Sequence, residues 1–116
     1  MVASIHNNVS ALQAFSKKMQ VSANNVANAY SDDFKKSRAI ISEGQGDSVK
    51  VEISKVDTPG PLVDDPKNPG ELKEISNTDF AEEFTQQIIA EKGFDANAKT
   101  IKQFDEMLGT VIDIIE

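Results

Sequence analysis

Few residues of this chain could take part in catalysis. The one histidine, His6, lies in a polar stretch near the N-terminus, and the chain contains no cysteine. Nucleophilic catalysis needs a nucleophile, a base that activates it and a group that orients the base. No second suitable group accompanies His6, so we interpret it as a solvated or interface residue. The sequence therefore predicts a protein that is not an enzyme.

Two other features could bind ions, and neither has the pattern that such a site requires. Asp57, Asp64 and Asp65 lack the alternating oxygen ligands and the glycine of a calcium loop. Gly44 and Gly46 do not lead from a buried strand into a helix, so they do not predict a phosphate-binding loop. We expect no cofactor, no metal and no small-molecule substrate. An enzyme or metal protein that uses the Asp57–Asp65 loop stays open as an alternative.

The net charge of −7 is distributed unevenly over the 116 residues. Residues 1–42 sum to +3, whereas residues 79–116 sum to −6. Binding to nucleic acid depends on neutralising phosphates, so this acidic chain is not expected to bind it. The opposite charges of the two ends favour their pairing. The N-terminus lacks the charged region and unbroken apolar block of a cleaved signal peptide, and no apolar run approaches the roughly 18 residues of a membrane span.

The stretch Thr78–Glu116 contains no proline and predicts one long helix. Asp79 is a candidate N-cap, and Glu82 three residues later could bond back to the backbone N–H of the cap. Apolar residues then recur at heptad spacing. Such a seam cannot be buried by the helix alone, so it must pack against another helix.

The second helix is predicted from Ala3 to about Tyr30, where apolar residues also recur every seven positions. We expect Leu12, Met19 and Val26 to meet Phe94, Ile101 and Leu108 in a seam within the chain. The full predicted seam comprises Ile5, Leu12, Met19, Val26, Phe80, Phe84, Phe94, Ile101, Leu108 and Ile112.

Several residues in the two helices are poor helix formers. Asn25 and Asn28 belong to a dense group of asparagines, and Gly93 and Asn97 interrupt the second helix. One interpretation is a frayed, solvated helix end. The other, which we favour, is that Asn25, Asn28, Gly93 and Asn97 are candidate contacts with other subunits.

The middle of the chain has a different pattern. Ser37–Glu43 and Ser48–Val56 flank the turn sequence Gly44–Asp47 and predict a β-hairpin. Asp57–Leu72 contains all four prolines and predicts an extended loop or linker with no helix and no central strand. The predicted fold class is mainly α: an antiparallel coiled-coil pair of N- and C-terminal helices with a small β-hairpin and a proline-rich loop as an insert. We divide the chain into an N-terminal helix and turn (residues 1–34), a hairpin and loop (35–76) and a C-terminal helix (77–116). Together these three parts are expected to form one structural unit.

Three stretches of the chain carry a resemblance to a known family. They comprise Ser10–Ala14, Ser22–Asn28 and Phe34–Lys36 in the first stretch; Asn77–Asp79, Glu82–Phe84, Ile88–Ala90, Phe94–Ala98 and Met107–Leu108 in the second; and Val63–Pro69 in the third. These stretches resemble the axial proteins of bacterial flagella, the family of rod, hook and hook-associated proteins, and the third is similar to a loop of the proximal rod proteins of the FlgC type. The family usually has a glycine in the turn after the asparagines, where this chain has Asp33, which can also adopt a left-handed backbone.

The resemblance implies a structural subunit of the flagellar basal-body rod that polymerises through its terminal helices and transmits torque. It implies partners that are copies of the same chain and other rod proteins, and export by the flagellar type III apparatus. It also implies a place in the periplasmic rod, reached without a cleaved signal peptide. The alternative that stays open is a helical adaptor or binding module that does not polymerise.

Overall fold

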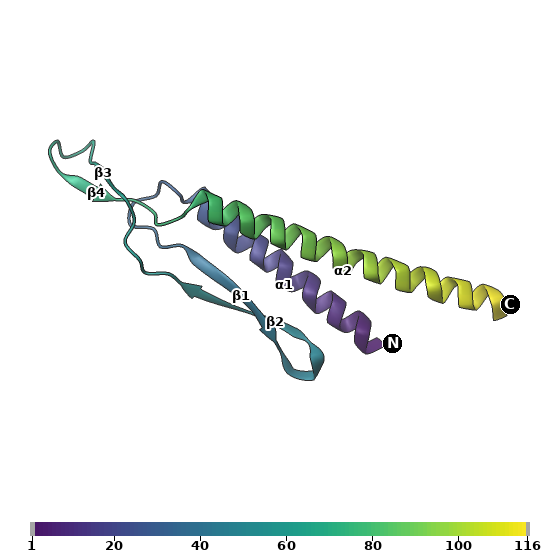
Figure 1. Cartoon of the computed structure of the whole chain (residues 1–116). Coiled ribbons are helices and arrows are strands. Elements are labelled where there is room, and N and C mark those ends of the chain that lie inside the picture. The colour runs from purple at the N-terminus through teal and green to yellow at the C-terminus, as the bar shows by residue number, and fades with distance from the viewer. Residues whose placement is uncertain (1, 116) are drawn as a thin grey trace.

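The computed structural model describes residues 2–115, and the side chains from Ile5 to Ile114. Two long antiparallel helices lie side by side, and two small β-hairpins connect them (Figure 1). The molecule is elongated, with extents of 79 × 24 × 17 Å. The elements in order are α1 (Val2–Ala27), β1 (Ser37–Glu43), the 3-10 turn η1 (Gln45–Asp47), β2 (Val49–Lys55), β3 (Leu62–Asp64), β4 (Leu72–Glu74) and α2 (Phe80–Ile115).

The start of α2 is capped by one of the two residues expected to do so. An oxygen of Asp79 accepts a hydrogen bond from the backbone N–H of Ala81 at 2.9 Å, as an N-cap residue does. Glu82 does not return to the cap. Its two oxygens bond instead to Lys36 and Arg38 on the segment that enters β1. The predicted capping box is therefore wrong in its second half, because nearby cations attract the carboxylate of Glu82.

The first hairpin lies along α1 (Figure 1). β1 and β2 pair antiparallel from Ser37↔Lys55 to Glu43↔Val49, so Ala39, Ile41 and Val51 share one face. Ala39 on that face is buried. The backbone N–H of Val49 donates to the hydroxyl of Ser10 in α1 at 3.1 Å. This hairpin forms where the period-two pattern predicted it.

The predicted fold class is wrong about the proline-rich segment, which contains a second antiparallel sheet. β3 pairs with β4 from Leu62↔Glu74 to Asp64↔Leu72. Proline cannot donate to a strand ladder, yet the strands form because the prolines lie outside the paired positions. Pro61 precedes β3 and accepts a bond from Ile75 N–H at 3.0 Å. The observed fold is therefore two helices with two two-stranded sheets, and not the predicted helix pair with one hairpin and a loop.

The helix pair is present, but it does not show the predicted coiled-coil packing. Small and polar side chains occupy its buried side: Ala11, Ala14, Ser22 and Asn25 on α1, and Glu83 and Ala90 on α2. The large seam residues lie on the flanks of the interface, where Phe84 and Phe94 are 51% and 41% exposed. Small side chains let the two backbones approach closely, and this approach moves the bulky heptad residues outward.

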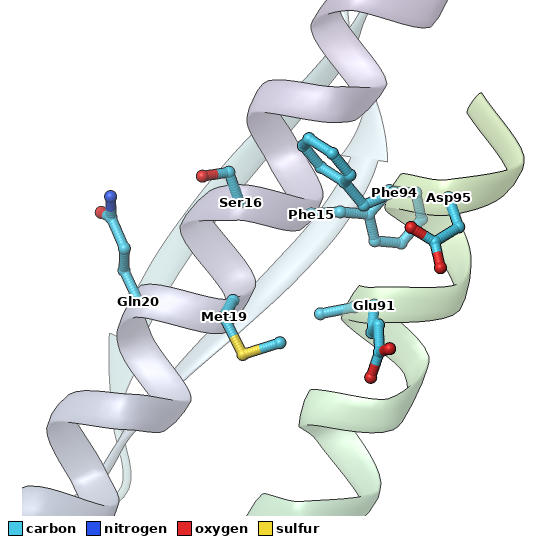
Figure 2. Close-up of a pocket in the computed structure, with 8 residues that line it drawn as sticks. Phe15, Ser16, Met19, Gln20, Glu91, Phe94 and Asp95 are labelled. Atoms are coloured by element: carbon cyan, nitrogen blue, oxygen red, sulfur yellow. The ribbon is translucent and has the colours of Figure 1, made fainter. Parts of the chain in front are cut away.

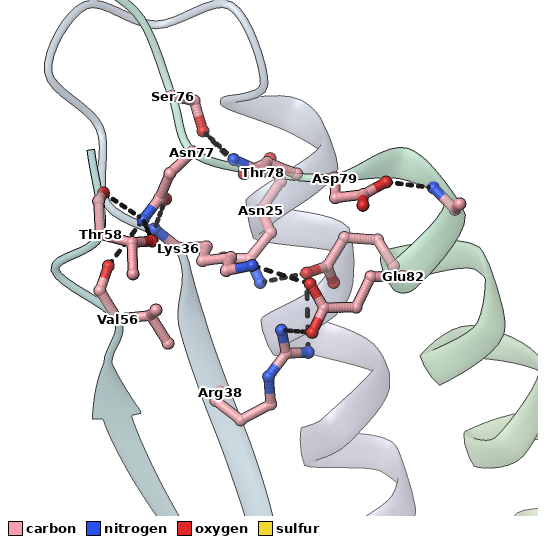
Figure 3. Close-up of polar contacts among 12 residues, drawn as sticks. Asn25, Lys36, Arg38, Val56, Thr58, Ser76, Asn77, Thr78, Asp79 and Glu82 are labelled. Carbon is pink, nitrogen blue, oxygen red and sulfur yellow. Dashed lines mark hydrogen bonds and ion pairs between the residues drawn. The ribbon is translucent and has the colours of Figure 1, made fainter. Parts of the chain in front are cut away.

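Three connecting segments meet where the hairpins join α2: the segment before β1, the segment between β2 and β3, and the segment between β4 and α2. The side-chain amide of Asn77 donates to the carbonyls of Val56 and Thr58 at 2.7 and 2.9 Å, while its oxygen accepts from Lys36 N–H at 2.7 Å (Figure 3). Gly60 is required at this crossing, because a Cβ there would overlap the carbonyl oxygen of Ile75.

Glu74, on β4, makes further hydrogen bonds at the same crossing. Its carboxylate accepts from Gly60 N–H at 2.8 Å and from the ammonium of Lys35. The Gly60 N–H first, and then Lys35, hold the pKa of Glu74 below its ordinary value of 4.5. Glu74 thus joins the second hairpin to the chain that precedes β1.

The turn after α1 has the backbone that the sequence suggested. Asp33 has φ of 55°, in the left-handed region where the family usually has glycine. Its N–H donates to the carbonyl of Glu74 at 3.0 Å, and Asp32 pairs with Lys73 at 3.0 Å. The turn is therefore tied directly to β4.

Candidate functional site: a buried polar junction and a helix groove

Asn25 is the centre of a buried polar cluster where α1, β1 and α2 meet, and its side chain is 0% exposed. Its oxygen accepts from Ser37 N–H at 2.9 Å, and its amide donates to the Ser37 carbonyl at 2.8 Å. The same amide donates to a carboxylate oxygen of Glu83 at 3.1 Å. One side chain thereby satisfies the first residue of β1 as a neighbouring strand would.

Glu83 is the buried acid of this cluster, also 0% exposed. The guanidinium of Arg38 lies 3.7 Å from its Oε1, while Ser22 donates to its backbone carbonyl at 3.0 Å. Burying a charge costs free energy unless the group is paired and hydrogen-bonded, and in Glu83 only Oε1 has such partners, because Oε2 is buried without a hydrogen bond from any described residue. We call the set Ser22, Asn25, Lys36, Arg38, Glu82 and Glu83 the polar junction; Figure 3 shows most of its contacts.

The cations around the junction influence one another. Lys36 and Arg38 both pair with Glu82, with Lys36 Nζ 2.7 Å from Oε2. Lys18 lies on the facing side of α1. Partial burial, and second the charge of Arg38, lower the pKa of Lys18. The junction therefore balances its charges internally and holds the two helices and β1 in one register.

Beyond the junction, α1 and α2 cross at Gly93. A Cβ at this position would overlap the ring of Phe15. Beside the crossing, the two helices border an open groove of about 320 Å³. Figure 2 shows Met19 from α1 and Phe94 from α2 bordering it. We call this the helix groove; it is lined chiefly by Phe15, Ser16, Met19, Gln20, Ala90 and Phe94.

The last part of α2 projects past the described start of α1 (Figure 1). Every described side chain from Asp105 to Ile114 is exposed. Several of these side chains are large and apolar: Met107 is 68% exposed, Val111 51% and Ile112 56%. We call Asp105–Ile115 the α2 overhang. An exposed apolar stripe of this kind is typical of a surface that contacts another protein.

The predicted seam residues differ in exposure between the two helices. On α1, Ile5, Leu12, Met19 and Val26 are half-buried, as is Ile101 on α2. Leu12 and Met19 both lie beside Phe94 along the groove, so this part of the seam is brought together. The remaining seam residues of α2 are exposed: Phe80, Phe84, Leu108 and Ile112. Phe80 and Phe84 stack on each other with centroids 5.9 Å apart.

The four candidates for contacts with other subunits also have different environments. Asn25 makes its hydrogen bonds inside the polar junction, and Gly93 lies against the ring of Phe15 where the two helices cross. The amide of Asn28, just after α1, donates to the carbonyl of Asn24, and the amide of Asn97 donates to the carbonyl of Gly93 within α2. Part of the surface of both side chains is accessible.

The residues considered for catalysis or metal binding remain apart. His6 is exposed on α1. Within residues 2–115, no three histidine or acidic side chains come close enough together to hold a metal ion. Asp65 instead closes the turn between β3 and β4, where bonds from Lys67 N–H and then the Asn68 amide lower the pKa of its carboxyl group.

Sequence reasoning missed Glu83 and Phe15. The signal that could have revealed them is the spacing of small residues on α1: Ala11, Ala14 and Ser22 fall on one face. Small residues mark where two backbones approach, so the bulkier residues between them lie at the edge of the contact.

Comparison with known proteins fits these elements. A sequence model for "Flagella basal body rod protein" matches residues 5–32, which contain most of α1. A second, for "Flagellar basal body rod FlgEFG protein C-terminal", matches residues 69–114, which include β4 and nearly all of α2. Together they cover more than half of the chain, so it belongs to the rod and hook family of flagellar proteins, a family of structural components.

Individual relatives narrow the assignment only partly. The chain is 51% identical over 41 residues to the flagellar hook protein FlgE of Treponema pallidum, which covers 35% of this chain and 9% of that protein. It is 46% identical over 39 residues to FlgE of Borreliella burgdorferi, with 34% and 9% covered. It is 42% identical over 41 residues to the basal-body rod protein FlgG of Bacillus subtilis, with 35% and 16% covered.

The matches thus span no more than about a sixth of each relative's length. The relatives carry the names FlgE and FlgG, and assignment to FlgC in particular stays a prediction. In the part of the chain that the structure describes, neither helix is long and apolar enough to cross a membrane.

Proposed function

We propose that this chain is a structural subunit of the flagellar basal-body rod, which polymerises through its terminal helices and transmits torque. The observation that carries the proposal is that the two rod-family matches fall on α1 and α2, the two helices that leave apolar surface uncovered. Its partners would be copies of itself and neighbouring rod proteins. Export by the type III apparatus to the periplasmic rod belongs to the same proposal.

The surface area of the monomer supports an assembled state. A compact monomer of 12.6 kDa exposes roughly 6,200 Å². This chain exposes 7970 Å². The excess of roughly 1,800 Å² is about twice the roughly 800 Å² that each partner contributes to one standard protein–protein interface. Such a surplus is expected of a subunit whose surface is completed by neighbours.

The finer assignment is to a proximal rod subunit of the FlgC type, with the sequence of residues 63–69 as its support. In the structure this sequence forms the end of β3 and the turn before β4. The turn is exposed and held by Asp65, so it is presented on the outside of the monomer.

The proposal is tested by deleting the gene in the source bacterium and restoring it as wild type, Leu108→Asp or Thr110→Asp. We expect the deletion strain to lack rods and motility. Leu108→Asp should fail to restore them, since it places a charge on the apolar side of the overhang. Thr110→Asp is the matched control, on the opposite side of the same exposed turn.

Isolated basal bodies then decide between the two classes of protein. Presence of this chain in the rod fraction supports the structural role. Motile deletion cells, with a purified chain that stays monomeric at high concentration, would instead favour the non-polymerising adaptor.

A further inference from the structure

We propose that the polar junction binds one internal water molecule, which donates hydrogen bonds to Oε2 of Glu83 and to Oε1 of Gln86. The water supplies the donor that this buried carboxylate does not obtain from the protein. The site lies inside a single chain, so it does not depend on the proposed function.

The first argument is that two buried side-chain oxygens on α2 have no hydrogen-bond donor among the described residues. Oε1 of Glu83 accepts from the Asn25 amide at 3.1 Å and lies 3.7 Å from the guanidinium of Arg38, but Oε2 has no such partner. Oε1 of Gln86 is also buried and without a donor. Gln86 follows Glu83 by three residues, so the two side chains share one face of α2. A buried acceptor without a donor costs free energy, and the cost is higher when the acceptor is charged.

The second argument is a small cavity that both side chains line. It measures about 10 Å³, and its walls come from α1, β1 and α2. One water molecule needs roughly 10–15 Å³, so the cavity is at the lower limit for a single water and too small for an organic molecule. The position and the size of the cavity therefore both fit one water molecule next to the two oxygens.

The third argument is the chemistry of the lining. An ionised carboxylate and an amide oxygen only accept hydrogen bonds, so the occupant must donate twice. Lys18 and Arg38 line the same cavity, and their nitrogens only donate. These two positive charges disfavour a metal cation, while the carboxylate of Glu83 disfavours an anion. Water can donate to both oxygens and accept from Arg38 or Lys18, which gives about the three hydrogen bonds that buried waters usually make.

Nuclear magnetic resonance of the full-length chain in water tests the proposal directly. A water molecule held inside a protein gives cross-peaks to nearby protons, and their sign in rotating-frame spectra distinguishes a through-space contact from proton exchange. The methyl group of Ala39 is the probe, because Ala39 is buried, lines the cavity and has no exchangeable side-chain proton. We expect a through-space cross-peak between water and this methyl group.

Two variants exclude a signal relayed by exchangeable protons of the protein. Lys18 and Ser22 both line the cavity, and both carry protons that exchange with solvent. The cross-peak to Ala39 should therefore remain in Lys18→Met and in Ser22→Ala. Its loss in either variant, with the fold retained, would show that the signal came from that side chain, and would overturn the proposal.

A matched pair of glutamine variants tests the second acceptor. Gln86→Met keeps the length of the side chain and removes its oxygen. We expect the water cross-peak to Ala39 to become several-fold weaker, and the equilibrium constant of unfolding in urea to rise about tenfold. Gln103→Met, the same exchange at an exposed position of α2, should leave both quantities unchanged. Equal results for the two variants would contradict the assigned site.

The wild-type chain alone can also overturn the proposal. If the amide of Gln86 donates directly to Glu83, no water cross-peak reaches Ala39 and the side-chain amide protons of Gln86 exchange slowly. If Glu83 is protonated and donates to Gln86, its carboxyl carbon has the chemical shift of the neutral acid at pH 7. Either result removes the water site and leaves the proposed structural role as it stands.

Discussion

Asn25 shows how much one side chain can determine in a molecule with little apolar core. It hydrogen-bonds both backbone groups of Ser37 and one oxygen of Glu83. The sequence suggested an interfacial role because the residue is a poor helix former. The structure shows what this poor helix former contributes: its low helix propensity is a small cost beside three hydrogen bonds, of which the one to Glu83 is buried and the two to Ser37 are part-buried.

We expect Asn25→Ala to lower the free energy of unfolding by about 2–4 kcal/mol, because it leaves buried polar groups without partners. Urea denaturation followed by circular dichroism measures the change. Asn24→Ala, one position earlier on the exposed side, is the control and should change stability by about 0.5 kcal/mol or less. Equal effects at the two positions would contradict the role given to the polar junction.

Gly93 and Gly109 provide a matched pair of glycines in one helix. An alanine at position 109 meets no atom within 4 Å, so Gly109→Ala should stabilise the protein by up to about 1 kcal/mol through helix propensity. An alanine at position 93 overlaps the ring of Phe15. We expect Gly93→Ala to be about 1–3 kcal/mol less stable than Gly109→Ala, as for overpacked cores.

The same urea titration measures this pair. The added variant Phe15→Leu, which replaces the ring with a smaller side chain, should recover part of the loss of stability at position 93. Two alanine variants of equal stability would show that the helices do not cross closely at Gly93.

At the scale of elements, both long helices and the first hairpin were predictable because each has a period that the sequence displays directly. The second hairpin was not. Its strands have three residues each, and four prolines around them indicate a loop by every local rule. What forms it is non-local: Gly60, Glu74 and Asn77 bring three separate segments together, and such contacts leave no periodic signal.

Glu74 gives this crossing a dependence on pH. Its pKa is lower in the folded protein than the ordinary 4.5 expected on unfolding, so the unfolded state binds more protons below that pH. The stabilisation is complete above about pH 4.5 and is lost as the pH falls through the folded pKa. We expect Glu74→Gln to reduce stability at pH 7 and to approach the wild type by pH 3.

Urea midpoints at both pH values test this prediction. Glu71→Gln, at an exposed position in the same hairpin connection, is the control. A stability difference between Glu74→Gln and wild type that stays constant with pH would contradict the assigned contacts.

For the whole molecule, the choice of buried face could not be read from the sequence. Heptad spacing of large residues indicated one side of α1, yet the second helix approaches the side where alanine and serine allow it. Both sides have a suitable period, and only the closeness of approach decides between them. The bulky residues that remain outside then become the surface available to other molecules.

This arrangement predicts that the fold and self-association can be separated. Ending the chain after Phe104 removes residues whose described side chains are all exposed. We expect this truncated chain to keep a helical circular dichroism spectrum, reduced only by the α2 residues that are removed, and nearly the same monomer melting temperature, while losing self-association in sedimentation experiments. Unchanged association after truncation would exclude the overhang as the contact surface.

The alanine-lined interior also has a calorimetric consequence. The buried hydrophobic residues among those described are all alanines: Ala11, Ala14, Ala29, Ala39 and Ala90. The heat capacity of unfolding rises with newly hydrated apolar area, and average proteins gain about 12–15 cal/mol/K per residue. We expect the monomer to lie below that range in scanning calorimetry, which gives a flat stability curve. A subunit of this kind would keep nearly the same modest stability in cold and in warm surroundings.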